Sequence, residues 1–141
     1  MRSEGVYRKT EITMVATTIS ESMIIGGKRL VEEIDSLGFS PEAALWMYSP
    51  ENGDWKLLLS FSDIERVGPR FYYEKIQRAI SKLEDEVEIS LDDVVLTKPA
   101  NPVIHLLRKT VQTGPGIAGI RFSNNVVNGH LIEDAYIYRL G

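Results

Sequence analysis

The residues best suited to chemistry lie on the last predicted hairpin of the chain. If the Asn-Gly pair at 128–129 forms a two-residue turn, the predicted cross-strand pairs are Ile120–Ile137, Arg121–Tyr136, Phe122–Ala135 and Ser123–Asp134. Arg121 then lies diagonally across from Asp134, within reach of an arginine side chain. Because strand side chains alternate, Tyr136 and Tyr138 then share the face of Asp134. A guanidinium oriented by a carboxylate and flanked by phenols can bind a phosphate, a carboxylate or a base. The candidate ligand-binding residues are Arg121, Asp134, Tyr136, Tyr138 and, from elsewhere in the chain, Arg70.

The same residues also have a structural interpretation, which stays open. In that case Asp134 only neutralises Arg121, at a point where the sheet passes under a helix or a second subunit. Both interpretations depend on the turn, because a loop one residue longer would reassign every cross-strand partner.

Two glycine-rich segments fit a structural role better than phosphate binding. The Thr-Gly-Pro-Gly loop at 113–116 leaves a predicted helix and enters a strand, so the helix dipole has the wrong sign for an anion. Gly114 is sufficiently explained as the stop of that helix. Gly26-Gly27 precede two cations, but no Walker pattern occurs in the sequence, which favours close packing of a helix on the sheet.

The sequence offers little for a metal, a cofactor or covalent catalysis. It has no cysteine and two histidines, which excludes disulfide scaffolds, thiolate zinc sites, iron–sulfur clusters and cysteine nucleophiles. Glu133 and Asp134 point to opposite faces of a strand, and Asp92-Asp93 suit a turn that enters a strand. No Gly-x-Ser-x-Gly motif is present. We therefore expect no metal and no cofactor.

Charge is unevenly distributed along the chain. Residues 1–97 carry 11 basic and 18 acidic side chains, which gives −7, whereas residues 98–141 carry 5 basic and 2 acidic, which gives +3. The basic last third could face an anion, a nucleic acid or an acidic partner, or it could be balanced by the acidic helices of the same molecule. The net charge of −4 and the absence of a zinc-finger or RNP motif do not favour nucleic-acid binding.

Apolar periodicity and turn signals predict an α+β domain, with a single five-stranded antiparallel or mixed sheet and three helices in the order α-β-β-α-β-α-β-β. This domain covers residues 14–141, and residues 1–13 are expected to form a loose N-terminal arm. The predicted elements are a helix from Ser20 or Ser22 to Leu37, strands Ala43–Ser49 and Trp55–Ser62, a helix Phe71–Glu86, a strand within Asp92–Thr97, a helix from Pro102 to Thr113, and strands Ile117–Ser123 and His130–Leu140. Helical spacing places Tyr72, Ile76, Ala79, Ile80 and Leu83 on the inward side of the helix Phe71–Glu86.

The first predicted hairpin indicates how the sheet is covered. With a loop at 51–54, Trp46 pairs with Leu59 and Tyr48 pairs with Leu57, and both faces of the hairpin are apolar. Three helices are few for both faces of a five-stranded sheet, so we favour a homodimer built on part of the sheet. The alternative is a monomer whose helices are split between the two faces.

Several segments resemble a family of small uncharacterised bacterial proteins. They are Ala44–Tyr48, Trp55–Leu57, Val67–Arg70, the Gly-Ile-Arg-Phe run that ends at Phe122, Asn128-Gly129, and the Ile-Glu-Asp-Ala-Tyr-Ile-Tyr-Arg-Leu run at 132–140. The resemblance covers about Leu30 to Leu140 and implies a bacterial cytoplasmic setting, but it brings no activity with it.

Together these observations predict a soluble, cytoplasmic protein, since the chain start lacks an apolar signal core and no apolar run approaches the length of a membrane span. The favoured function is a non-enzymatic binding or protein-interaction module, acting as a homodimer or on a protein partner. The alternative is an enzyme or sensor that binds a phosphorylated small molecule or nucleotide through Arg121.

Overall fold

The computed structural model describes residues 18–127 and 129–141. The predicted arm at 1–13 lies outside the described residues, as does the turn residue Asn128. Five strands form one mixed sheet in the order β3-β2-β1-β5-β4, in which only the β2–β3 pair is parallel. The strands are β1 (Ala43–Ser49), β2 (Asp54–Ser60), β3 (Val94–Thr97), β4 (Ile120–Val127) and β5 (His130–Leu140).

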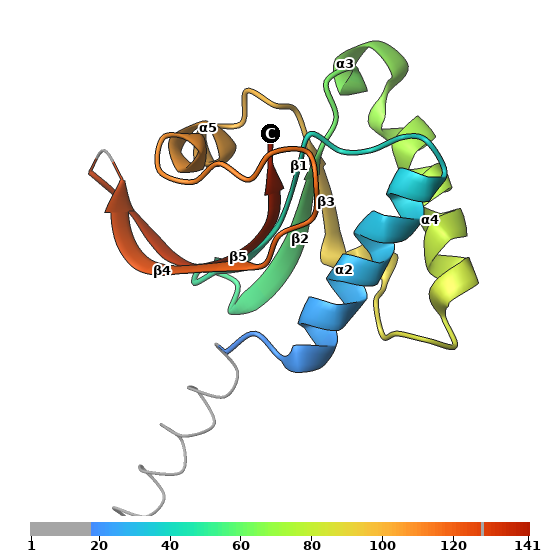
Figure 1. Cartoon of the computed structure of the whole chain (residues 1–141), viewed down its shortest axis with the longest axis horizontal. Helices are drawn as coiled ribbons and strands as arrows, with labels where there is room; N and C mark the ends of the chain where they lie inside the picture. The colour runs from blue at the N-terminus through green and yellow to red at the C-terminus, as the bar shows by residue number, and fades with distance from the viewer. Residues whose placement is uncertain (1–17, 128) are drawn as a thin grey trace, which may run out of the picture.

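The helices lie on both faces of this sheet (Figure 1), which confirms the α+β class. The helical elements are α2 (Glu21–Ser36), the single turn α3 (Ile64–Val67), α4 (Pro69–Leu83), the 3₁₀ turn η1 (Leu91–Asp93) and α5 (Pro102–Arg108).

Two separate apolar clusters, one on each face of the sheet, show which helices cover which face. One cluster joins α2 and α4 to the sheet face that carries Trp46 and Leu57. The other joins α5 to the opposite face, which carries Leu45 and Ile137. The helices of one chain therefore cover both faces, which is the monomer alternative considered above. A homodimer stays a prediction, but coverage of the sheet no longer argues for it.

Local signals explain the long helices. Ser20 caps α2, because its Oγ accepts a hydrogen bond from the Met23 backbone N–H at 3.1 Å. Pro69 opens α4, a position that needs no backbone donor. The buried side of α4 is the predicted one, consisting of Tyr72, Ile76, Ala79, Ile80 and Leu83.

Helices α4 and α5 end several residues earlier than predicted, and one helical turn was not predicted. Helix α4 ends at Leu83 rather than Glu86. Helix α5 ends at Arg108 rather than Thr113, in keeping with the β-branched residues that follow, which lose rotamer freedom in a helix. The turn α3 was not predicted, because four residues are too few to show helical periodicity.

The two hairpins differ in how well their register was predicted. In β4–β5 the observed pairs include Arg121 with Tyr136 and Ser123 with Asp134, which confirms the prediction. In β1–β2, Trp46 pairs with Leu57 rather than Leu59, because the loop occupies 50–53 and closes with the Gly53 N–H bonded to the Ser49 carbonyl. The error is two residues, so every side chain keeps its predicted face.

None of the helices in the described part of the chain is long and apolar enough to cross a membrane.

Candidate functional site

Arg121 and Asp134 form a bidentate ion pair on the β4–β5 hairpin. The Arg121 Nε lies 2.6 Å from the Asp134 Oδ1, and its Nη2 lies 2.5 Å from the Oδ2. The hydrogen bond to Asp134 raises the pKa of Arg121 above its ordinary value. The Arg121 side chain is 44% exposed, against 13% for Asp134. One planar fork of the guanidinium, its Nε–Nη2 edge, is therefore occupied by the chain's own carboxylate.

We call Arg121, Asp134, Tyr136 and Tyr138 on the β4–β5 hairpin the predicted strip. Its two tyrosines do not have the positions expected of residues that contact a ligand. Tyr138 is only 1% exposed, and its hydroxyl donates to the Ile24 carbonyl at 2.5 Å and accepts from the Trp46 Nε1 at 3.1 Å. It joins α2 to the sheet from inside the core. Tyr136 is half-buried and packs over Gly119, where a Cβ would meet the Tyr136 hydroxyl oxygen at 2.5 Å.

Arg70 is not brought to this strip. It lies in the first turn of α4, its side chain is 93% exposed, and it pairs with Glu74 at 3.6 Å. Figure 1 separates α4 from β4 across the width of the molecule. The strip is thus one ion pair beside two structural tyrosines, and the geometry supports its structural interpretation.

A buried ion pair that the sequence analysis missed lies at the other end of β5. Arg139 is 5% exposed, and it makes two bonds to the Asp35 carboxylate at 3.0 and 2.6 Å. It also donates to the carbonyls of Pro41 and Gly116. Burial raises the pKa of Asp35, but the hydrogen bonds from Arg139 and Ser40 outweigh burial, so the pKa is lowered overall.

A β-bulge is the reason for the position of Arg139. Ala44 pairs with Arg139 while Leu45 pairs with Ile137, so Tyr138 is an extra residue in β5. The bulge places Tyr138 and Arg139 on the same side of the sheet, toward α2. An arginine inside the apolar run at 135–140 is the signal in the sequence, although simple alternation would place it on the face of Ile137, opposite to the one observed.

The surface of the α2–α4 pair carries two hollows of opposite charge. One, of about 300 Å³, is lined by Leu37, Phe39, Lys75, Arg78 and Lys82. The Lys75 ammonium lies 4.8 Å from the centroid of the Phe71 ring, and 5.6 Å from that of Phe39, at distances typical of cation–π contacts. We call this region the basic end, and it consists of Leu37, Phe39, Phe71, Lys75, Arg78 and Lys82.

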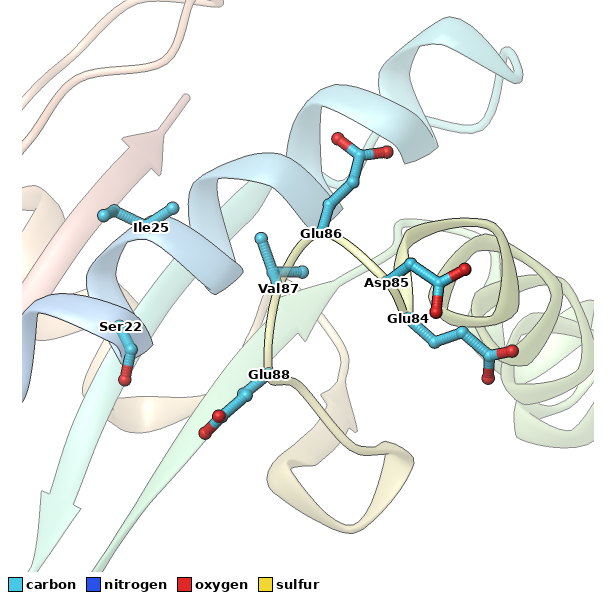
Figure 2. Close-up of a pocket in the computed structure, with 7 residues that line it drawn as sticks. All are labelled: Ser22, Ile25, Glu84, Asp85, Glu86, Val87 and Glu88. Carbon is cyan, nitrogen blue, oxygen red and sulfur yellow. The ribbon is translucent and has the colours of Figure 1, made fainter.

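The second hollow, of about 410 Å³, lies between the start of α2 and the loop that follows α4 (Figure 2). In Figure 2 the carboxylates spread outward in different directions and do not converge on one point. Among the described residues, no three histidine, cysteine, aspartate or glutamate side chains gather as metal ligands. We call this region the acidic end, and it consists of Ser22, Ile25, Glu84, Asp85, Glu86, Val87 and Glu88.

Ion pairs between the helices fix how the two ends are arranged. Lys82 contacts Glu33 at 3.3 Å, and Arg29 contacts Glu86 at 2.8 Å. The later of these two α2 residues contacts the earlier position on the α4 side, so the two helices run antiparallel. The basic end therefore lies along α4 beside the last turn of α2, and the acidic end lies beside the first turn of α2, where the loop after α4 passes.

No family model matches the chain, and no curated protein or solved structure matches it. The resemblance to a family of small bacterial proteins stays a prediction.

Proposed function

We propose that this chain is a non-enzymatic protein-interaction module that pairs with a second copy of itself through the α2–α4 surface. The observation that carries the proposal is the arrangement of one basic, partly apolar end and one acidic, partly apolar end on the same helix pair. A two-fold axis between the ends would place the basic end of each copy on the acidic end of the other. Such a surface is complementary to itself in charge.

Exposed apolar side chains support the same surface. In the described part of the chain, five large apolar side chains are exposed, and three of them belong to these two ends. Leu37 and Phe71, each 45% exposed, lie at the basic end, and Ile25, 47% exposed, lies at the acidic end. Apolar contacts inside a charged rim are the usual composition of an interface between proteins.

The geometry does not favour the alternative of an enzyme or sensor that acts through Arg121. The Nε–Nη2 edge of its guanidinium is bonded to Asp134, which neutralises the charge and leaves only the Nη1–Nη2 edge for a ligand. For the setting of the protein we keep the bacterial cytoplasm that the family resemblance implies.

A charge swap tests the proposed dimer. Arg78→Glu at the basic end and Glu84→Arg at the acidic end each bring like charges together, so each should weaken dimerisation by about ten-fold or more. The double variant restores opposite charges and should restore the dimer. Sedimentation equilibrium at micromolar concentrations measures all three dissociation constants.

Matched controls carry the same charge changes elsewhere. Lys109→Glu follows α5 and Glu133→Arg lies on β5, and both positions are exposed. They should leave the association unchanged. A wild-type protein that stays monomeric at these concentrations, or a double variant no better than the single ones, would contradict the proposal.

A further inference from the structure

Arg108 is an arginine whose charge has no partner in the described part of the chain. It is the last residue of α5 and is half-buried. Its Nε atom is buried and has no hydrogen-bond acceptor. None of the ion pairs between described residues includes it, in contrast to Arg121 and Arg139. The Nη groups of Arg108 have no acceptor among the described residues either, and they are not among the buried unpartnered atoms, so they are the donors that a ligand can reach.

Two adjoining hollows lie beside this side chain. The larger, of about 530 Å³, has Arg108 and Arg139 in its lining, together with Ser40 and Glu42. The smaller, of about 300 Å³, also includes Arg108, with Gln112 and Gly114. Because Asp35 compensates the charge of Arg139, the uncompensated positive charge at this place belongs to Arg108.

The glycine-rich loop at 114–116 borders both hollows. Gly114 borders the smaller and Pro115 the larger. A Cβ built at Gly114 or Gly116 would meet no heavy atom within 4 Å, so the backbone here is open to approach. The sequence analysis treated this loop and the basic last third of the chain separately, and the fold brings them together.

We infer that Arg108 binds a small oxyanion, a phosphate or a carboxylate group, in the space between α5, the 114–116 loop and the end of β5. The two Nη groups of a guanidinium form a planar fork whose N–H donors match two oxygens of either group. The Gln112 side chain, which lines the smaller hollow, can donate to a remaining oxygen. Glu42, exposed at the edge of the larger hollow, favours a ligand with one anionic group over a polyanion.

The test is a titration followed by nuclear magnetic resonance on the Arg108 Nε–H signal of nitrogen-15-labelled protein. Sodium phosphate and sodium acetate are the two probes, each at an ionic strength held constant with sodium chloride. We expect a saturable shift with at least one of them, and the comparison tells whether a phosphate or a carboxylate is preferred. A shift that never saturates with either probe overturns the inference.

Variants separate this site from general charge effects. Arg108→Gln should weaken binding about ten-fold or more, through loss of the charge-assisted bonds. Arg108→Lys, which keeps the charge but loses the fork, should also bind more weakly than wild type. Lys109→Gln removes a neighbouring exposed charge and should bind as wild type does. If Arg108→Gln gives a folded amide spectrum and binds the probe as tightly as wild type, the arginine is not the ligand.

This inference is independent of the proposed dimer. Arg108 belongs to the helix on the opposite face of the sheet from α2 and α4. A monomeric protein could still bind the anion, and a dimer without anion binding would refute only the site at Arg108.

Discussion

At the residue scale, three arginines of the basic last third differ in what surrounds their guanidinium groups. Arg121 is paired and largely exposed, so solvent screens its bond to Asp134. Arg139 is paired and buried, and its four bonds join β5 to the end of α2 and to two loops. Arg108 is half-buried and has no partner among the described residues. The three arginines thus have different roles, because burial and the presence or absence of a nearby carboxylate decide how strongly each guanidinium charge is stabilised.

We predict that Arg139→Ala destabilises the fold by about 3 kcal/mol or more, because it leaves the Asp35 carboxylate partly buried without its partner. Arg121→Ala should cost about 1 kcal/mol or less, because the Arg121 side chain is itself 44% exposed and its removal opens Asp134 to water, whereas the Arg139 side chain is 7% exposed. Urea denaturation of both variants measures the two free energies of unfolding. Equal costs would show that burial does not separate these ion pairs.

The same pair predicts a pH dependence. The folded-state pKa of Asp35 is lowered, so its contribution to stability is present above its unfolded pKa of about 3.9 and is lost as the pH falls through the folded value. In Asp35→Asn the loss of stability on acidification below about pH 4 should be shallower than in wild type. A curve parallel to that of wild type would contradict the pairing.

At the element scale, the seating of α2 on the sheet depends on a close contact at Gly27. A Cβ there would lie 2.5 Å from both the Trp46 Nε1 and the Tyr138 hydroxyl oxygen, which are joined by a hydrogen bond. The glycine lets the helix backbone approach this buried polar pair. Its role is packing, as the absence of a Walker pattern suggested.

We predict that Gly27→Ala destabilises the protein by about 1–3 kcal/mol, through the displacement of α2 or of the two rings. In an unconstrained helix the same change would stabilise by about 1 kcal/mol, so the sign of the effect is diagnostic. Gly116→Ala is the control, because a Cβ there meets no heavy atom within 4 Å. Thermal melts of the two variants decide, and a stabilised Gly27→Ala would refute the close contact.

At the scale of the whole molecule, the division of the helices sets which surfaces remain available. Since α2 and α4 cover one sheet face and α5 the other, an additional subunit is not required to cover the sheet. Its proposed place is the outer surface of the helix pair, where oppositely charged ends meet. A dimer formed there would be held together largely by attraction between exposed, oppositely charged side chains.

We therefore expect the dimer to weaken as salt is added. The screening length falls from about 10 Å at 0.1 M ionic strength to about 3 Å at 1 M, which removes most of the attraction between exposed ends. Sedimentation equilibrium in a sodium chloride series should show a rising dissociation constant. An association that is unchanged or tighter at high salt would point to a contact of apolar character, unlike the proposed one.

Local sequence determined much of this protein by itself. The alternation in β4–β5 predicted every described pair from Ile120–Ile137 to Ser123–Asp134, and helical spacing predicted the whole buried side of α4. Such patterns depend on neighbours within a few residues, so they can be read without the rest of the chain. The β1–β2 register was missed by two residues because it depends on how one loop closes.

Only the tertiary structure decided what the charged and aromatic residues do. Tyr138 shared a predicted face with Arg121, but α2 covers it and makes it part of the core. Arg139 turned inward through a bulge that pairs it with Asp35, 104 positions away in the chain. Whether a polar side chain is satisfied, buried or available depends on elements far away in sequence. Local pattern therefore predicted the elements, whereas long-range packing assigned the roles of their polar residues.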